Sequence, residues 1–255
     1  MKYLAFNLTL TFTCIVMFNT CSTPQIPKVF GHRGAMGHIT ENTLPSIAKA
    51  IDLGVDGVEI DVFKCASGEL VVFHDHTLDK LTNSSGYIEQ LDLDSIQKIE
   101  VLGGHTIPTL NEVLDLIDAR VILNIELKGT QTAIPTHELL QVYFDNGKWQ
   151  PNRILISSFN WKELEIFYEI NQEVPLAVLT EDDPLDAIST ALSIKAQAIN
   201  PYFKTLNASN IKKMKKAGLK IYTWTVNNPK DAQKMLALEV DAIISDFPEQ
   251  IKAFN

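Results

Sequence analysis

Short runs rich in β-branched residues alternate with amphipathic segments from Val29 onward. Such an alternation is typical of parallel strands joined by helices. The runs that we interpret as strands cover residues 29–31, 55–62, 70–74, 121–127, 154–158, 176–179, 198–200, 219–226 and 241–245. A closed barrel of parallel strands has eight of them, so this interpretation contains one run too many.

The link after the second run decides which strand is in excess. It covers only residues 63–69, whereas a parallel crossover needs about a dozen residues. Ser67-Gly68 suits a hairpin turn, so we expect residues 70–74 to return antiparallel to residues 55–62. The remaining strands predict an α/β fold, a (β/α)8 TIM barrel, somewhat distorted, with a β-hairpin and a short cap inserted after the second strand.

Helices are expected between these strands and after the last one, at residues 43–53, 110–118, 136–144, 161–170, 185–194, 209–217, 229–238 and 248–254. Their apolar residues recur with helical spacing, as Ile211 and Met214 do among the lysines of residues 209–217. We interpret that Lys run as a solvated face rather than a nucleic-acid patch. Residues 75–106 lie outside the alternation and predict a small cap with one amphipathic turn near residues 93–99.

The composition is that of one folded domain. The chain has 255 residues, of which 45% are hydrophobic, and this suits a single barrel domain over residues 29–255. The net charge of -9 opposes nonspecific binding to nucleic acid, which relies on Lys and Arg neutralising many phosphates. A small phosphodiester is compatible with this charge, because a bound cation reverses the sign of the local field.

Residues 1–20 have the pattern of an export signal. An apolar run over residues 4–18 follows Lys2 and is short for a membrane-spanning helix. Two of the cysteines, Cys14 and Cys21, lie near this segment. Only Cys65 remains in the expected barrel, so no intramolecular disulfide can form there.

The end of this segment resembles a bacterial lipobox, in which a Cys is lipidated and becomes the first mature residue. The matching sequence is FNTCS at residues 18–22, although Asn19 and Thr20 fit the small-residue pattern poorly. Plain secretion and a retained anchor are the alternatives. We expect export to the bacterial periplasm or cell envelope, lipid attachment at Cys21 and a short tether over residues 21–28.

Carboxylates occur at the ends of two expected strands. Glu59 and Asp61 lie two residues apart, as do Glu126 and Lys128, and residues two apart in a strand project to the same face. On their own, Glu59 and Asp61 would be interpreted as the acidic members of an ion pair at a strand end. Glu126, however, follows the apolar run 122–125, where an unpartnered carboxylate is unfavourable. At the C-terminal face of a barrel, the three predict an oxygen-lined site for Mg²⁺ or Ca²⁺.

Two histidines have the placement expected of a proton-transfer pair. His32 follows the apolar start of the first strand, and His74 ends the return strand. Both imidazoles titrate near neutrality, as a general acid and a general base require. Arg33 and Lys128 supply cations for a phosphate. The expected chemistry is therefore metal-assisted hydrolysis of a phosphodiester.

Neighbouring residues have more open roles. Gly34 and Gly37 would let the backbone turn closely over a substrate phosphate. Asp75 could orient an imidazole, cap a helix or form a turn. The remaining histidines read as loop or surface residues: His38, His76, His105 and His137.

The motifs, taken as a set, resemble a known family. They are Gly31-His32-Arg33-Gly34, Glu41-Asn42-Thr43, Glu59-Ile60-Asp61-Val62, HDHTLDKLT at residues 74–82, Glu126-Leu127-Lys128, Trp224-Thr225-Val226-Asn227 and DAIISDFP at residues 241–248. In this order they closely resemble the glycerophosphodiester phosphodiesterase family over residues 29–250. Lys80 and Leu81 stand where the family often has Arg and Thr, and Ser67-Gly68 replaces a common Asp-Gly turn.

The resemblance implies a barrel with a short inserted cap and a role for each site residue. Glu59, Asp61 and Glu126 would bind one divalent cation, Mg²⁺ or Ca²⁺. His32 and His74 would transfer protons. Arg33 and Lys128 would bind the phosphate, with help from Asn42. Trp224 would form an apolar wall for the glycerol or the leaving alcohol, or pack at the barrel rim, and Phe159 is equally open. Glu41 would support the site from outside or start the following helix.

The activity that the resemblance implies is hydrolysis of glycerophosphodiesters, the deacylated phospholipids, to sn-glycerol 3-phosphate and an alcohol. Either the glycerol 2-hydroxyl attacks phosphorus and water opens the resulting cyclic phosphate, or water attacks directly. Phospholipase D-like or lysophospholipase D activity on the same barrel is an alternative, and a noncatalytic lipoprotein that binds glycerophosphodiesters is another. The expected partner is a small-molecule diester, with no nucleic acid and with membrane contact only through the N-terminal lipid anchor.

Overall fold

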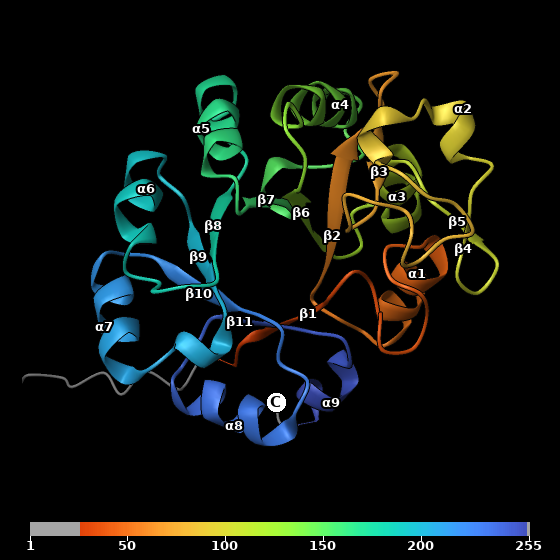
Figure 1. Cartoon of the computed structure of the whole chain (residues 1–255). Coiled ribbons are helices and arrows are strands. Elements are labelled where there is room, and N and C mark those ends of the chain that lie inside the picture. The colour runs from red at the N-terminus through yellow and green to blue at the C-terminus, as the bar shows by residue number, and fades with distance from the viewer. Residues whose placement is uncertain (1–25, 254–255) are drawn as a thin grey trace, which may run out of the picture.

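The structure is a computed structural model that describes residues 26–253. Its centre is a closed barrel of parallel strands in the order β1-β11-β10-β9-β8-β7-β6-β2, and β1 pairs with β2 to complete the ring (Figure 1). The strands are β1 (Lys28–Gly31), β2 (Gly57–Lys64), β6 (Ile122–Leu127), β7 (Ile154–Ser158), β8 (Leu176–Thr180), β9 (Ala198–Pro201), β10 (Lys220–Thr223) and β11 (Ala242–Ser245). The expected (β/α)8 barrel is confirmed. The expected export signal and lipobox lie outside the described residues.

Helices surround the barrel and connect its strands. They are α1 (Leu44–Asp52), α3 (Leu110–Ile117), α4 (Ala133–Asp145), α5 (Trp161–Ile170), α6 (Ala187–Ser193), α7 (Ala208–Lys216), α8 (Pro229–Ala237) and α9 (Pro248–Lys252), with 3-10 turns at Pro151–Arg153 and Phe203–Thr205. Capping hydrogen bonds explain where several of these helices begin. The Thr43 hydroxyl accepts a hydrogen bond from the backbone N–H of Ser46, and Thr109 forms a capping box with Glu112.

Helix α4 begins at Ala133, ahead of the expected start at residue 136. The reason lies in the next helix. The buried carboxylate of Glu163 accepts hydrogen bonds from the backbone N–H groups of Gln131, Thr132 and Ala133 at 2.7, 3.0 and 2.8 Å. An acidic group at a helix N-terminus satisfies free N–H groups and stabilises the helix dipole. Because Glu163 lies 30 residues from Ala133, no local motif indicates this start.

Strand β3 (Leu70–Val72) runs antiparallel to the end of β2, with Val72 opposite Val62, as the short link predicts. The cap follows it and consists of a 3-10 turn (Ile88–Gln90), α2 (Leu93–Ile96) and a hairpin of β4 (Glu100–Val101) and β5 (His105–Thr106). Helix α2 is the expected amphipathic turn, whereas the hairpin was not expected. The cap has an apolar core of its own, whose buried residues include Phe63, Phe73 and Ile88.

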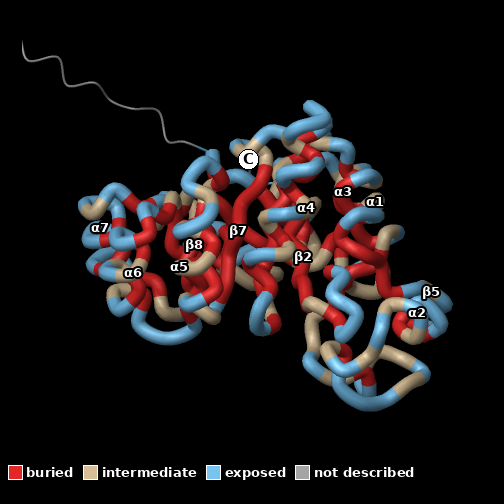
Figure 2. Tube along the Cα trace, turned by 90° about the horizontal axis from the view of Figure 1, so that it is seen from above, coloured by how far each residue is buried: buried red, intermediate tan, exposed pale blue. Residues whose placement is uncertain are grey.

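Two apolar layers hold the barrel together. The larger layer lies between the strands and the helices, where Ile47, Leu123 and Phe167 are fully buried. Figure 2 shows the buried strands β2, β7 and β8 between helices that carry exposed stretches. A smaller cluster fills the barrel interior, where the ring centroids of Phe30 and Tyr222 lie 6.2 Å apart. The barrel is therefore packed inside and is not an open channel.

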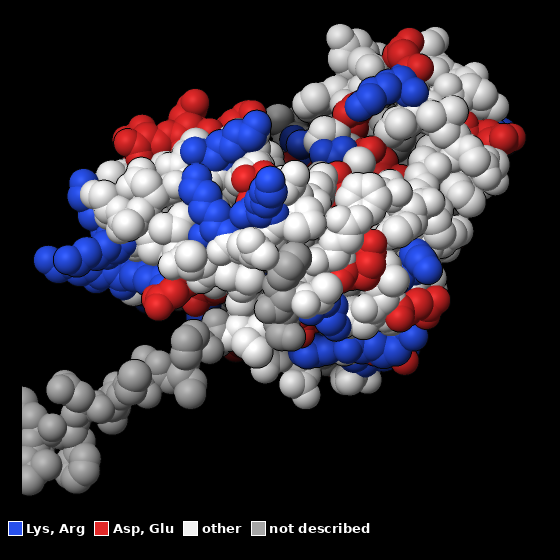
Figure 3. Space-filling view, turned by 90° about the horizontal axis from the view of Figure 1, so that it is seen from below, with Lys and Arg blue, Asp and Glu red and all other residues white. Residues whose placement is uncertain are grey.

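The surface charges follow the expected helix faces. The lysines of α7 are exposed while Ile211 and Met214 are buried, as expected of a solvated face. Figure 3 shows one face of the molecule, on which groups of basic side chains are interrupted by acidic and uncharged ones. Within residues 26–253, no helix has both the length and the apolar character needed to cross a membrane.

Candidate active site

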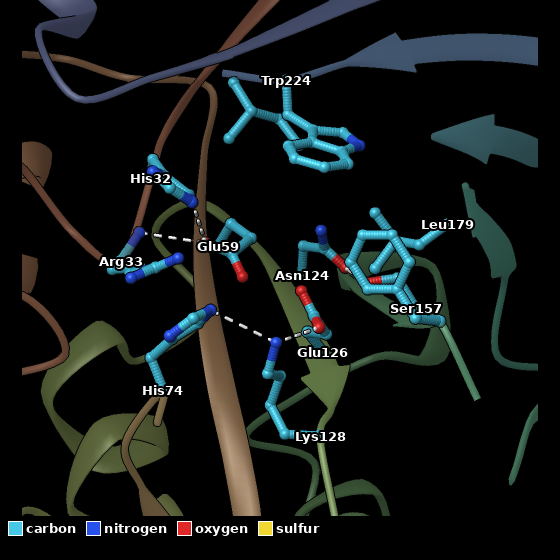
Figure 4. Close-up of a pocket in the computed structure, with 12 residues that line it drawn as sticks. His32, Arg33, Glu59, His74, Asn124, Glu126, Lys128, Ser157, Leu179 and Trp224 are labelled. Carbon is cyan, nitrogen blue, oxygen red and sulfur yellow. Dashed lines mark hydrogen bonds and ion pairs between the residues drawn. The ribbon is translucent and has the colours of Figure 1, made fainter. Parts of the chain in front are cut away.

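A pocket opens at the C-terminal ends of the strands, where active sites of this fold lie. It is lined by His32, Arg33, Glu59, His74, Asn124, Glu126, Lys128, Ser157, Phe159, Leu179, Trp224 and Ile244 (Figure 4). This lining contains all the site residues expected from the sequence except Asp61 and Asn42. Asp61 lies beside the lining, with its Oδ1 3.9 Å from Lys128 Nζ.

Strands β2 and β6 bring the three expected metal ligands together. Asp61 lies opposite Glu126 in the parallel register, and Glu59 precedes Asp61 by two residues on the same face. One carboxylate oxygen from each of the three lies within 4.8 Å of the others. All three side chains are buried. They form a compact cluster in which every potential ligand atom is oxygen.

Burial and mutual repulsion oppose ionisation of this cluster. Burial, together with the charges of Asp61 and Glu126, raises the pKa of Glu59 well above its usual value. Burial and the charge of Asp61 raise the pKa of Glu126 to about 7. Glu59 Oε1 is also buried without a hydrogen-bond partner. An unpartnered carboxylate oxygen beside two further carboxylates fits a divalent cation that prefers oxygen ligands, such as Mg²⁺ or Ca²⁺.

These pKa shifts predict how pH acts on the metal-free protein. The folded-state pKa of Glu126, about 7, lies above the ordinary value of 4.5. Protonated Glu126 therefore stabilises the folded state fully when the pH is below the ordinary pKa of 4.5. This stabilisation is lost as the pH rises through the folded-state pKa of about 7. Cation binding requires the ionised carboxylates and releases their protons. The Tm gain when Mg²⁺ or Ca²⁺ is added to EDTA-treated protein should be larger at about pH 8 than at about pH 5.

Scanning calorimetry at the two pH values measures this difference. A Tm gain that is equal at both, or larger in acid, would contradict a cation site built on carboxylates with raised pKa values.

Asn42 lies behind Asp61 rather than on the pocket surface. Its backbone is left-handed, with φ 56°. Its Nδ2 donates to Asp61 Oδ2 at 2.8 Å, and its Oδ1 accepts from the backbone N–H of Asp61 at 3.2 Å. Both ends of the amide are thus bonded to Asp61. The sequence assigned Asn42 to the phosphate, but the structure places it where it orients a candidate metal ligand.

Two cations flank the carboxylate cluster. Lys128 Nζ lies 3.0 Å from Glu126 Oε1. Arg33 donates from Nη1 to Glu41 Oε1 at 2.6 Å, and its Nε lies 3.4 Å from Asp61 Oδ2. Glu41 therefore supports Arg33 from outside the pocket, which is one of the two roles left open for it. Arg33 and Lys128 both line the pocket, where they can bind phosphate oxygens.

The glycines after His32 lie close to neighbouring parts of the chain. Gly34 has φ 86°, and a Cβ there would collide with Ser46 of α1. A Cβ at Gly37 would collide with the ring of Phe247. These close contacts with neighbouring parts of the chain explain why both positions are glycine. That this turn lies over a substrate phosphate stays a prediction.

Each site histidine uses Nδ1 for a carboxylate. The Nε2 atoms face the pocket, where that of His32 lies 4.0 Å from Glu59 Oε2 (Figure 4). His74 Nδ1 lies 2.5 Å from Asp75 Oδ1, and His32 Nδ1 lies 2.6 Å from Asp246 Oδ1. Asp75 therefore orients an imidazole, one of its three possible roles. On the other side, His74 Nε2 lies 3.2 Å from Lys128 Nζ. Burial, together with nearby cationic side chains, lowers the pKa of His74, so the ring can serve as a proton acceptor near neutrality.

Sequence reasoning did not assign Asp246 or Asn227, although both belong to the motifs that carry the family resemblance. Asp246 directly follows β11, just as His32 directly follows β1. Asn227 Nδ2 donates to Asp246 Oδ2 at 2.6 Å. The signal that identified His32, a polar residue directly after an apolar strand, also applies to Asp246. Ser157 and Asn124 were missed as well, and the Ser157 hydroxyl donates to Asn124 Oδ1 at 2.8 Å.

One wall of the pocket is aromatic. The rings of Phe159 and Trp224 meet edge to face, with centroids 5.4 Å apart, and Tyr202 packs against Trp224 at 5.5 Å. The indole N–H of Trp224 donates to the carbonyl of Asn200 at 2.8 Å. Trp224 therefore packs at the rim and also lines the pocket. Its role as a wall for the glycerol or the leaving alcohol stays a prediction. Phe159 lines the pocket too.

The other histidines of the described chain lie outside the pocket lining. His38 and His76 are exposed, as expected of surface residues. His105 belongs to strand β5 and His137 to helix α4, so neither is in a loop. His137 is half-buried because its ring packs edge to face against Phe167, with centroids 6.2 Å apart.

Comparison with known proteins places this chain among phosphodiesterases. The model of the glycerophosphoryl diester phosphodiesterase family matches residues 32–250. The glycerophosphodiester phosphodiesterase of Caldanaerobacter subterraneus subsp. tengcongensis is 32% identical over 231 residues, which cover 88% of this chain and 95% of that protein. That of Bacillus altitudinis is 32% identical over 235 residues, which cover 88% of this chain and 96% of that protein.

Solved structures agree with the sequence comparison. A phosphodiesterase of Oleispira antarctica, in complex with the product sn-glycerol-3-phosphate, superposes with a TM-score of 0.83 at 27% identity, covering 89% of this chain and 96% of that one. A putative glycerophosphodiester phosphodiesterase of Galdieria sulphuraria superposes with a TM-score of 0.82 at 28% identity, covering 91% and 99%. Since every residue that lines the pocket falls within the matched region, fold, site and sequence agree that this chain belongs to the glycerophosphoryl diester phosphodiesterase family.

Proposed function

We propose that the pocket hydrolyses glycerophosphodiesters, the diesters left when phospholipids lose their acyl chains, to sn-glycerol 3-phosphate and an alcohol. The observation that supports this best is the meeting in one pocket of a carboxylate cluster, two imidazole Nε2 atoms and the cations Arg33 and Lys128. The relative from Oleispira antarctica holds sn-glycerol-3-phosphate, the product expected here. Family membership supports the same reaction.

The side chains divide the reaction between them. Glu59, Asp61 and Glu126 would hold a divalent cation, which when bound acts as a Lewis acid toward a phosphoryl oxygen. Arg33 and Lys128 bind the other phosphoryl oxygens by charge-assisted hydrogen bonds and stabilise the negative charge of the transition state.

The two histidines move the protons. One Nε2 accepts the proton of the attacking hydroxyl, from either the glycerol C2 position or water, as that oxygen bonds to phosphorus. The other imidazole donates a proton to the leaving alcohol oxygen as the bond between that oxygen and phosphorus breaks. If the glycerol hydroxyl is the nucleophile, water then opens the cyclic phosphate to sn-glycerol 3-phosphate. Their Nδ1 atoms are held by Asp246 and Asp75, so both Nε2 atoms stay directed at the pocket.

Product analysis tests this function. Purified protein is incubated with glycerophosphocholine, glycerophosphoethanolamine, glycerophosphoglycerol and lysophosphatidylcholine, with and without EDTA. We expect sn-glycerol 3-phosphate and the free alcohol from the three soluble diesters, and no turnover with EDTA. A higher kcat/KM for lysophosphatidylcholine would favour lysophospholipase D activity, and binding without products would indicate a noncatalytic lipoprotein. Phosphocholine as the product would contradict the proposed position of bond cleavage.

We also propose that the protein is exported to the periplasm or cell envelope and attached to a membrane by a lipid on Cys21. The support is the apolar run at residues 4–18 and the lipobox-like sequence at residues 18–22, which lie outside the described residues. A single acyl chain gives only marginal membrane binding, whereas the several chains of a bacterial lipoprotein would hold the protein firmly.

Substitution of Cys21 tests the anchor. In the full-length protein, Cys21→Ser should abolish partition into the detergent phase or leave the signal uncleaved, because no thiol remains for the lipid. Phase separation and the mass of the mature N-terminus measure both effects. Cys14→Ser is the matched control and should change neither. Membrane association and signal processing that both survive Cys21→Ser would rule out lipidation at this position.

A further inference from the structure

A chain of two polar side chains holds His32 on the side away from the pocket. His32 Nδ1 lies 2.6 Å from Asp246 Oδ1, and Asp246 Oδ2 accepts from Asn227 Nδ2 at 2.6 Å. The three residues follow β1, β11 and β10, which are neighbours in the barrel. Neither Asp246 nor Asn227 lines the pocket, so both act on His32 from behind.

The orientation of the Asn227 amide is determined by its other contacts. Its Oδ1 accepts from the backbone N–H of Asp246 at 2.9 Å and from the hydroxyl of Ser245 at 3.2 Å. A backbone N–H can meet only an acceptor, so the oxygen must face Asp246 N and the NH₂ group must face Asp246 Oδ2.

This orientation determines where the proton of His32 lies. Burial raises the pKa of Asp246, but the hydrogen bonds from His32 and Asn227, together with the charges of His32 and Arg33, outweigh it and leave that pKa below its ordinary value. The ionised carboxylate offers only acceptors. The hydrogen in the 2.6 Å contact therefore belongs to His32 Nδ1, and in the neutral ring the lone pair is left on Nε2.

We propose that Asp246 and Asn227 are positioning residues, and that they lock neutral His32 in the Nδ1–H tautomer with the Nε2 lone pair facing the pocket. What Nε2 does there rests on the function proposed above, whereas the tautomer is a property of the free protein. His74 is held differently. Its partner Asp75 is the next residue in the chain, and Asp75 in turn lies 3.7 Å from the exposed Lys80.

The variant Asp246→Asn should reverse the tautomer. The NH₂ group of Asn227 still requires an oxygen, so the new amide turns its oxygen to Asn227 and its own NH₂ to His32 Nδ1. Nδ1 must then accept, and the ring proton moves to Nε2. If His32 is the base, a neutral ring with its proton on Nε2 cannot accept one from the nucleophile. If it is the acid, the ring loses the carboxylate that stabilises the imidazolium. In either role kcat should fall by about 10²- to 10⁴-fold, with a much smaller change in KM.

The double variant Asp246→Asn with Asn227→Asp should reverse this loss in part. Its net charge equals that of the wild type, but the carboxylate stands one position farther from the ring. That carboxylate accepts from Ser245, from the backbone N–H of residue 246 and from the new amide NH₂. The amide oxygen is then free to accept from His32 Nδ1. We expect kcat at least about 10-fold above that of Asp246→Asn, whereas a merely structural role predicts further loss from a second change.

Ring ¹⁵N shifts of labelled histidines test the tautomer without turnover, with the His32 signals identified by their loss in His32→Gln. At about pH 8, we expect protonated Nδ1 in the wild type, protonated Nε2 in Asp246→Asn, and protonated Nδ1 again in the double variant. A wild-type ring protonated at Nε2 would overturn the proposal even if no variant folds. So would a wild-type-like kcat and tautomer in Asp246→Asn. Wild-type protein with the expected tautomer that cleaves no diester would count against the proposed function alone.

Discussion

His32→Ala and His74→Ala should each lower kcat by about 10²- to 10⁴-fold, because a general acid or base contributes that much to catalysis. The loss should fall on kcat more than on KM, since each imidazole acts on a proton that moves in the transition state. Steady-state kinetics with glycerophosphocholine measure both constants. His105→Ala, in the β4–β5 hairpin of the cap, is the control and should leave kcat nearly unchanged. A near-wild-type rate for either site variant would refute the two-histidine mechanism.

A diester with a nitrophenolate leaving group then assigns the two roles. This leaving group departs with little protonation, so the variant that lacks the general acid should regain much of its rate while the other stays inactive. Equal rescue of both variants would contradict separate acid and base roles. Arg33→Ala provides a contrast, because loss of a phosphate contact should also raise KM.

Removal of the divalent cation should abolish turnover, and Mg²⁺ or Ca²⁺ should restore it. Glu126→Gln preserves the shape of the side chain but removes one of the three charges of the cluster, so it should weaken metal binding and lower kcat by about 10³-fold or more. Titration of EDTA-treated protein, followed by calorimetry and by rate, measures both effects. Which cation binds more tightly depends on coordination number and site rigidity, and the same titration compares the two.

Glu165→Gln is a matched control on the outer helix α5, where Glu165 pairs with Lys162 at 3.0 Å on the surface. It removes the same charge outside the pocket lining and should change neither metal affinity nor rate. Full activity of metal-free protein would overturn the assignment of a catalytic cation. A Glu126→Gln variant that binds metal as the wild type does would remove Glu126 from the ligand set.

Much of the barrel could be predicted because its elements are encoded locally. Runs such as residues 154–156, Ile-Leu-Ile, are apolar throughout, as expected of strands buried on both faces. The brevity of the link 63–69 allowed only an antiparallel return for β3. The β4–β5 hairpin escaped prediction because each of its strands has only two residues, too few to show an alternation. The start of α4 escaped because Glu163 caps it from another helix.

The candidate site, like the fold, could be predicted from the sequence only in part. Glu59, Asp61 and Glu126 could be grouped from sequence because the strand period and the shared C-terminal face of a barrel bring them together. The partners of Asn42 and Asp246 could not, because they depend on where loops carry side chains after the strands end. Asn42 has a left-handed backbone, and it is this turn that aims its amide at Asp61 instead of at the substrate.

Closure of the barrel also governs when this enzyme can first become active. Strand β1 pairs on one side with β11, and His32 finds its carboxylate on a residue 214 positions later in the chain. Because a chain leaves the ribosome N-terminus first, the carboxylate cluster, Arg33 and Lys128 are all synthesised well before Asp246. Until β11 emerges, β1 has no neighbour on one side and His32 has no partner for Nδ1. The nascent chain therefore carries most of its catalytic groups in an incomplete barrel, and the last strand to be made completes the site.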